Sequence, residues 1–110
     1  MARFVKGDVV VLPFPFSDLS TSKKRPALIV ANLEGDDFIL AQITSAKKFD
    51  KYSVKLNKSD FKYGSFSVAS FIRPNKLFTA DKSIFMYKKA SIVSLKIKEV
   101  ESSLLSIFID

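Results

Sequence analysis

Short runs of apolar residues, separated by polar, glycine- or proline-containing segments, make up most of the chain. The runs are rich in β-branched and aromatic residues and are too short for comfortable helices, so they favour strands. Strands are expected at residues 9–12, 27–31, 38–44, 52–56, 66–72, 76–80 and 83–87. Their close spacing indicates a mainly β fold, a small barrel, in which the second and third strands form a hairpin.

The segments between these runs carry turn and loop residues. Residues 13–22 are proline-rich and then polar, which predicts a long loop. Residues 45–51 predict a basic loop, and residues 57–64 could hold one helical turn, with Gly64 at a turn position. The segment Arg73–Asn75 contains a proline and is expected to end the strand before it.

The end of the chain has a different period. Ile97, Val100, Leu104 and Ile107 recur at helical spacing with polar residues between them, which predicts one amphipathic C-terminal helix. Its apolar stripe could pack on the barrel or support an oligomer, and the periodicity does not separate these alternatives. At 110 residues, without a repeat or a second compositional region, residues 1–110 are expected to form a single domain.

Composition narrows the possible chemistry. The chain has 18 Lys and Arg against 11 Asp and Glu, a net charge of +7, which favours a polyanionic partner such as nucleic acid or an acidic protein. It contains no histidine and no cysteine, so neither a nucleophile–imidazole pair nor a zinc site is expected, and no cofactor is predicted. No apolar run approaches the roughly 20 residues of a membrane span, so a soluble, cytoplasmic protein is expected.

The positive charge is densest directly before a predicted strand, in Lys23–Val30. Pro26 fixes its own backbone and biases Arg25 towards extended geometry, so the guanidinium would be held by a rigid element. Rigidly held arginine suits phosphate recognition. The alternative is that Arg25 forms a structural ion pair with Asp8 or Asp18.

An arginine and nearby hydroxyls can act on RNA without a protein nucleophile, because the 2′-OH of RNA can attack the adjacent phosphate itself. The enzyme would then orient that hydroxyl, handle its proton and stabilise the extra negative charge on the phosphorane. The sequence therefore favours RNA among the possible polyanions.

Five segments in order resemble one known family. They are Gly7–Val10, the Pro-Phe segment after it, Lys24–Val30, Gln42–Ser45 and Ser70–Pro74. Together with Lys76–Thr79 and the terminal amphipathic stretch, they make the chain similar to the MazF/PemK family of toxin endoribonucleases over nearly its whole length.

The resemblance implies an SH3-like β-barrel with an appended helix, a homodimer, and a cognate antitoxin as partner. It also implies metal-independent cleavage of single-stranded RNA that leaves a 2′,3′-cyclic phosphate and a 5′-hydroxyl. Arg25 matches the catalytic arginine of the family and Thr44 its catalytic threonine. The RNA-binding residues expected around them are Lys23, Lys24, Gln42, Ser45, Ser70 and Arg73.

The chain departs from the family before the Arg-Pro pair. Many relatives carry a glutamine-bearing, glycine-containing segment there, whereas this chain has Leu19–Lys24, whose two lysines could bind phosphate instead. The departure leaves a second hypothesis, a barrel that binds nucleic acid without cutting it. A peptide-binding SH3-like module is a third, although the chain has no tryptophan and no clear aromatic groove.

Overall fold

The computed structural model describes residues 3–14, 23–45 and 50–109. Within them, seven antiparallel strands form one sheet in the order β4-β6-β3-β2-β1-β7-β5, and one α-helix follows. The strands are β1 Asp8–Phe14, β2 Lys23–Asn32, β3 Asp37–Thr44, β4 Val54–Leu56, β5 Phe61–Tyr63, β6 Ser70–Asp81 and β7 Tyr87–Ile92. The short 3₁₀ helices are η1 Lys58–Asp60 and η2 Lys82–Ile84, and the α-helix is α1 Ser94–Ile109.

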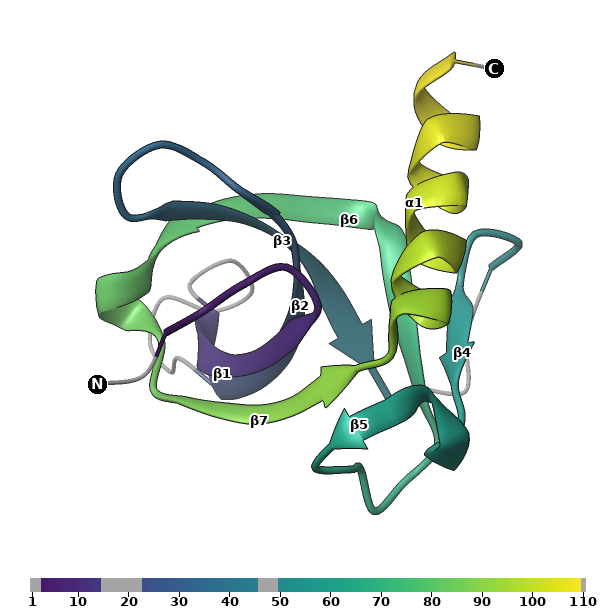
Figure 1. Cartoon of the computed structure of the whole chain (residues 1–110), viewed down its shortest axis with the longest axis horizontal. Coiled ribbons are helices and arrows are strands. Elements are labelled where there is room, and N and C mark those ends of the chain that lie inside the picture. The colour runs from purple at the N-terminus through teal and green to yellow at the C-terminus, as the bar shows by residue number, and fades with distance from the viewer. Residues whose placement is uncertain (1–2, 15–22, 46–49, 110) are drawn as a thin grey trace.

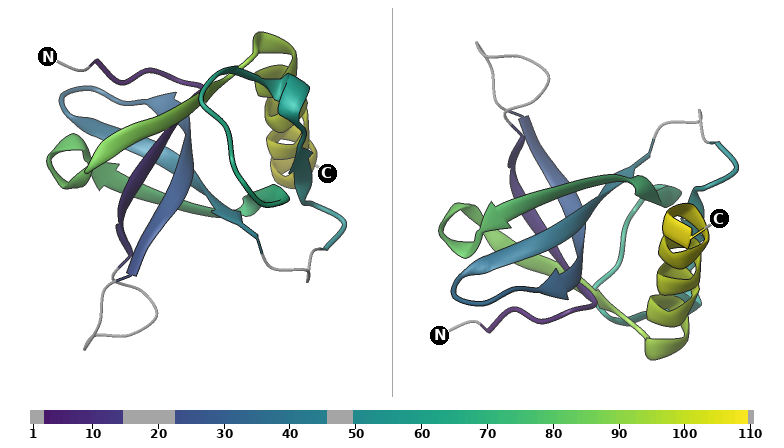
Figure 2. Two further views of the ribbon diagram at one scale, coloured as in Figure 1. Left: turned by 90° about the horizontal axis from the view of Figure 1, so that it is seen from below. Right: turned by 90° about the horizontal axis from the view of Figure 1, so that it is seen from above.

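The sheet is strongly curled (Figure 1). The helix stands at one side of it, next to β4 and the part of β6 that pairs with β4 (Figures 1 and 2). The expectation of a mainly β fold with a C-terminal helix is thereby confirmed. The predicted hairpin is also confirmed, since β2 pairs with β3 around a turn at Glu34–Asp36.

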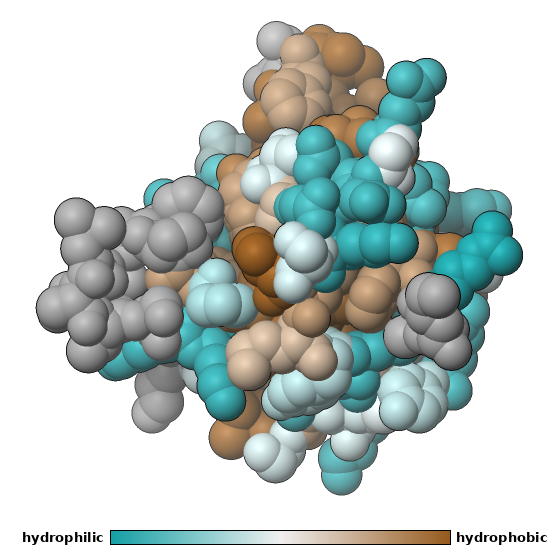
Figure 3. Space-filling model, turned by 90° about the vertical axis from the view of Figure 1, so that its left-hand side faces the viewer, coloured by the Kyte–Doolittle hydropathy of each residue, from teal (hydrophilic) through white to brown (hydrophobic). Residues whose placement is uncertain are grey.

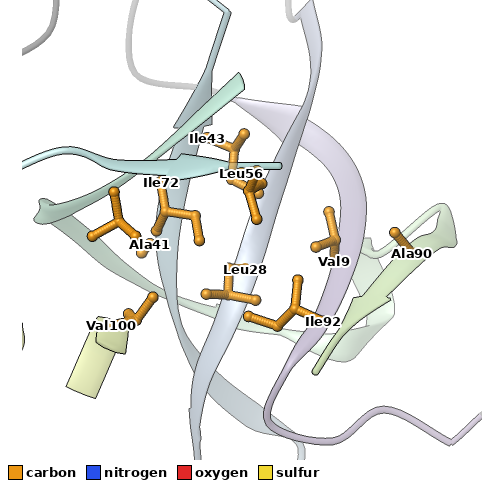
Figure 4. Close-up of a cluster of buried hydrophobic side chains, with 10 residues drawn as sticks. Val9, Leu28, Ala41, Ile43, Leu56, Ile72, Ala90, Ile92 and Val100 are labelled. Atoms are coloured by element: carbon orange, nitrogen blue, oxygen red, sulfur yellow. The ribbon is translucent and has the colours of Figure 1, made fainter. Parts of the chain in front are cut away.

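The central strands are apolar on both faces because each face has its own core. In β1, Val9 belongs to one cluster and its neighbour Val10 to the other, as the alternation of side chains along a strand requires. In β2, Leu28 and Ile29 divide in the same way. Figure 4 shows the first cluster, in which side chains from the strands meet Val100 of the helix. Burial on both sides explains why these strands appear in the sequence as continuous apolar runs.

The helix confirms the predicted stripe. Val100 is buried in the first cluster, and Ile97 and Leu104 pack against it. The last turns stand clear of the sheet, and Figure 3 shows this projecting end, at the top of the view, as a hydrophobic surface. Phe108 and Ile109 are 69% and 75% exposed there. No helix in the described ranges is long and apolar enough to cross a membrane.

Two expectations about β6 were wrong. Arg73–Asn75 does not end a strand, because β6 runs without interruption from Ser70 to Asp81. Its pairing with β3 shifts register between Ala41 and Gln42, and this irregularity accommodates the proline, which has no N–H to donate. Residues 66–69, expected to begin a strand, lie before β6 instead.

The expected strand at 83–87 was also wrong. Residues 82–84 form η2, in which the Asp81 carboxylate accepts a hydrogen bond from Ser83 N–H at 2.7 Å, and the strand β7 begins only at Tyr87. The strand β5 was not expected at all, although the helical turn before it and the positive φ of Gly64, 70°, agree with the prediction. Most of the predicted loops at 13–22 and 45–51 lies outside the described residues.

Candidate nucleic-acid site

A pocket of about 490 Å³ opens where β2 begins and β3 ends. Its first wall comes from these two strands, and its second wall comes from the segment between β5 and β6, with a lysine from β7. The lining residues are Lys23, Lys24, Arg25, Pro26, Ile43, Thr44, Ser45, Phe66, Ser67, Val68, Ser70 and Lys89. Six of the eight predicted site residues are among them.

The two predicted catalytic residues line the same pocket. In the pairing of β2 with β3, Ala27 lies opposite Gln42 and Leu28 opposite Ala41. Arg25 and Thr44 lie two residues beyond the last pair, Ala27 and Gln42, on β2 and β3 respectively. Both line the pocket between these strand ends, so a ligand bound there can be reached from both strands.

Arg25 is held from its other side as well. In the pairing of β1 with β2 it lies opposite Leu12, a buried residue of the second core cluster. The backbone of Arg25 is therefore part of the sheet, while its side chain is exposed to solvent. This combination provides a fixed origin for a long guanidinium-bearing side chain, as phosphate recognition requires.

The pocket is strongly basic. Lys23, Lys24, Arg25 and Lys89 all line it, and none of the lining residues that the structure describes is acidic. No carboxylate of the described residues forms an ion pair with any of these four cations. The arrangement can therefore attract and bind an anionic ligand.

The structural alternative for Arg25 is not formed with Asp8. The buried Asp8 carboxylate accepts hydrogen bonds from Ser91 Oγ at 2.8 Å and from Val5 N–H at 3.0 Å, and Lys88 Nζ lies 3.5 Å away. These partners tie the N-terminal segment to β7. Asp18, the other suggested partner, lies outside the described residues.

Ser45 and Ser70 complete the hydroxyl side of the pocket. Ser45 is exposed, whereas Ser70 is only 2% exposed, and its Oγ donates a hydrogen bond to the Val68 carbonyl at 3.0 Å. Ser70 thus shapes the pocket by holding the backbone of its second wall. Thr44 is half-buried and lines the pocket together with Arg25.

Gln42 and Arg73 do not line the pocket, although they lie opposite each other on β3 and β6. Arg73 donates to the Asp50 carboxylate at 3.3 Å, and Asn75 Nδ2 donates to the same oxygen at 3.0 Å. Desolvation alone raises the pKa of Asp50, but the hydrogen bonds from Asn75, Tyr52 N–H and Arg73 lower it below its ordinary value. The structure thus gives Arg73 a carboxylate partner within the fold, and its RNA-binding role stays a prediction.

The second wall of the pocket was not anticipated. Phe66 was expected in a strand, and Lys89 was not among the predicted site residues. Gly64 explains why the segment lies where it does: a Cβ there would come within 2.3 Å of the Lys89 carbonyl oxygen. The positive φ of Gly64 was the one local signal, because it marks a sharp turn. What the turn packs against depends on tertiary structure.

Comparisons with known proteins identify the family and the fold of the chain. The family model for the PemK-like, MazF-like toxin of type II toxin–antitoxin systems matches residues 5–108. A solved endoribonuclease from Mycobacterial species, in complex with its cognate antitoxin, has a TM-score of 0.74 at 14% identity, covering 94% of this chain and 93% of that chain. A comparison with curated protein sequences finds no match.

Two further solved structures have the same fold. The Mycobacterium tuberculosis toxin MazF-mt6 has a TM-score of 0.72 at 11% identity, covering 93% of this chain and 96% of that chain. In a MazE–MazF structure from Deinococcus radiodurans, the TM-score is 0.69 at 20% identity, covering 93% and 91%. The chain therefore has the fold of these proteins over nearly its full length.

Proposed function

The chain belongs to the PemK-like, MazF-like family of toxins of type II toxin–antitoxin systems, and we propose that it is itself an endoribonuclease that cuts single-stranded RNA. The observation that carries this proposal is that Arg25 and Thr44 line one pocket, whose described lining residues include four cations and no acid. A sugar–phosphate backbone is the polyanion that such a pocket suits, and single-stranded RNA can present its own nucleophile there.

In the proposed reaction, the 2′-oxygen of RNA forms a bond to the adjacent phosphorus, and the bond from phosphorus to the 5′-oxygen breaks. The products are a 2′,3′-cyclic phosphate and a 5′-hydroxyl, and one proton moves in balance from the 2′-oxygen to the 5′-oxygen. Arg25 donates hydrogen bonds to the phosphate oxygens as their charge grows. A guanidinium group has five N–H donors and no acceptor, so Arg25 stabilises charge and does not take up the proton.

Thr44 and the two lysines position the substrate. The Thr44 hydroxyl, in the same pocket as Arg25, orients the attacking 2′-OH or the phosphate by hydrogen bonding. Lys23 and Lys24 lie at the start of β2 and are exposed, so they bind flanking phosphates as point charges. No step uses a metal ion.

Two protein partners belong to the proposal. A cognate antitoxin with acidic segments would cover the basic pocket, and the complexes of the mycobacterial and Deinococcus proteins support this. A second copy of the chain would cover the projecting apolar end of α1, where Leu105 is 58% exposed and Phe108 is 69% exposed. A sedimentation measurement that finds only monomer at micromolar concentration would contradict the homodimer.

The decisive experiment is incubation of the purified protein with mixed-sequence RNA in excess chelator, followed by analysis of the product ends. We expect cyclic phosphates and 5′-hydroxyls from the wild type and no cleavage by a folded Arg25→Ala variant. Cleavage that stops in chelator, or an active Arg25→Ala variant, would contradict the mechanism. Binding without cleavage would instead support the non-catalytic hypothesis.

A further inference from the structure

The second wall of the pocket carries an aromatic ring together with a cation. The Phe66 ring is half-buried, and its centroid lies 5.7 Å from that of Phe61, with the two rings inclined by 32°. Lys89 Nζ lies 5.0 Å from the Phe66 centroid. Both Phe66 and Lys89 line the pocket, whereas Phe61 does not. Phe61 therefore supports the ring from outside the pocket.

The backbone of this wall is anchored at several points. The pairing of β5 with β7 and the turn at Gly64 bring the segment against β7. At its other end, the buried Ser70 hydroxyl holds the Val68 carbonyl at 3.0 Å. Between these anchors the Val68 side chain remains 58% exposed, beside Phe66. An apolar surface on a supported backbone thus faces solvent inside a basic pocket.

One wall of the pocket suits the phosphate of a nucleotide, and the other wall suits its base. Arg25 and Thr44 offer donors suited to a phosphate, and Phe66 and Val68 offer an apolar surface suited to the face of a base. Lys89 and Phe66 are both only half-buried and the contact of the ammonium with the ring is a weak one, so a stacked base can replace the cation. The displaced ammonium of Lys89 is then available to a phosphate.

We propose that Phe66 and Lys89 form a nucleobase subsite, in which a base flanking the cleaved phosphodiester stacks on Phe66 and Lys89 turns to the neighbouring phosphate. The subsite rests on the proposed RNA substrate and makes the second wall a determinant of sequence selectivity. Stacking favours bases with a larger ring surface, so adenine is bound more tightly than uracil.

The first test measures binding without cleavage. The probes are fluorescein-labelled decamers of 2′-O-methyladenosine and of 2′-O-methyluridine, which have no free 2′-OH to attack. We expect Phe66→Leu to weaken adenosine binding at least about fivefold, and uridine binding less, because a stacked base is lost. Tyr63→Leu is the matched control, since Tyr63 is an aromatic residue that is 58% exposed but does not line the pocket. Equal affinities for wild type and Phe66→Leu would overturn the subsite, as would no binding of either probe by the wild type.

A second variant keeps the test valid if Phe66→Leu folds poorly. The chain has no tryptophan, so Phe66→Trp introduces a single fluorophore at the subsite and preserves an aromatic ring. Its emission should be quenched as the adenosine probe saturates the protein. Unchanged emission on saturation would overturn the proposal.

Lys89→Met separates the two roles within the subsite. It should retain the preference for adenosine over uridine while the slope of log affinity against log salt falls by about 0.7, the value for one phosphate on a single strand. Loss of the base preference with an unchanged slope would contradict the proposed role of Lys89.

Failure of the subsite and failure of the proposed function give different results. If mixed-sequence RNA is cut but Phe66→Leu binds the adenosine decamer like the wild type, the ribonuclease stands and the subsite falls. If the adenosine decamer quenches Phe66→Trp but no RNA is cut, the base-binding subsite stands and the catalytic proposal falls.

Discussion

The buried Lys96 and the four cations that line the pocket have opposite surroundings. Lys96, at the start of α1, is nearly buried and donates to the Lys55 carbonyl at 3.0 Å and to Glu99 at 2.8 Å, with Asp60 at 3.3 Å. The cations that line the pocket are accessible and have no carboxylate partner among the described residues. One group connects secondary-structure elements, and the other is available to a ligand.

The difference follows from the cost of removing charge from water. A buried ammonium group must be compensated by acids and carbonyls, and Lys96 obtains them from β4, η1 and its own helix. The cations of the pocket keep their hydration, so the fold can leave them unpaired at little cost. The partners of a cation, more than its presence, distinguish a structural role from a binding role in this chain.

The largest effect on RNA cleavage should come from replacing Arg25, which has no carboxylate partner among the described residues. Arg25→Gln removes the donor aimed at the phosphate, and we expect RNA cleavage to fall by about 100- to 1,000-fold with the unfolding midpoint almost unchanged. Arg3→Gln is the matched control, since Arg3 is an exposed arginine that does not line the pocket. It should leave both the cleavage rate and the unfolding midpoint almost unchanged. Equal losses of cleavage activity in the two variants would contradict the proposed role of Arg25.

Replacing the buried cation should affect stability instead. Lys96→Met leaves Asp60 without its ammonium partner and Glu99 without its hydrogen bond, and we expect a loss of about 3 kcal/mol in the free energy of unfolding. Urea denaturation measures this loss. Lys98→Met, on the same helix at an exposed position, should change the free energy by less than about 0.5 kcal/mol. A similar small change for both variants would contradict the structural role of Lys96.

A smaller effect is expected from a single lysine of the pocket. Lys24→Gln should weaken RNA binding modestly and lower the slope of log affinity against log salt by about 0.7, because one phosphate contact is lost. Lys82→Gln removes the same charge at a position 3.4 Å from Asp36 and away from the pocket, so its slope should remain that of the wild type. Equal slopes for the two variants would indicate that only net charge matters.

The parts of the fold that could be predicted depend on local pattern. The apolar runs of β1 to β3 and the helical spacing from Ile97 to Ile107 are visible within a few residues, so the hairpin and the helix were predicted correctly. Arg25 and Thr44 were named from the resemblance to a family, and they line one pocket at the start of β2 and the end of β3.

The parts that could not be predicted depend on distant partners. The break expected at Pro74 is absent because β6 pairs with β3 and β4 on either side and absorbs the proline at a register shift. Lys88 lies in β7 with its ammonium 3.5 Å from Asp8, a residue 80 positions earlier in the chain. The wall formed by Phe66 and Lys89 arises only when β5 pairs with β7. No local pattern encodes these contacts.

The pH dependence of the free energy of unfolding tests whether the charge of Lys96 stabilises the fold. Burial alone lowers the pKa of Lys96, but its hydrogen bonds to Glu99 and Asp60 and the charges of both acids outweigh this, so the pKa lies above its ordinary value of 10.5. A group whose pKa is raised by folding contributes stability that is fully present below its unfolded pKa and is lost as pH rises through the folded pKa. The difference in unfolding free energy between wild type and Lys96→Met should therefore be constant from pH 7 to about 10 and shrink above 10.5. Taking the difference cancels the titration of the other lysines and tyrosines, which both proteins share. A difference that stays constant through pH 11 to 12 would show that packing of the side chain, and not its charge, stabilises the junction of α1 with β4 and η1.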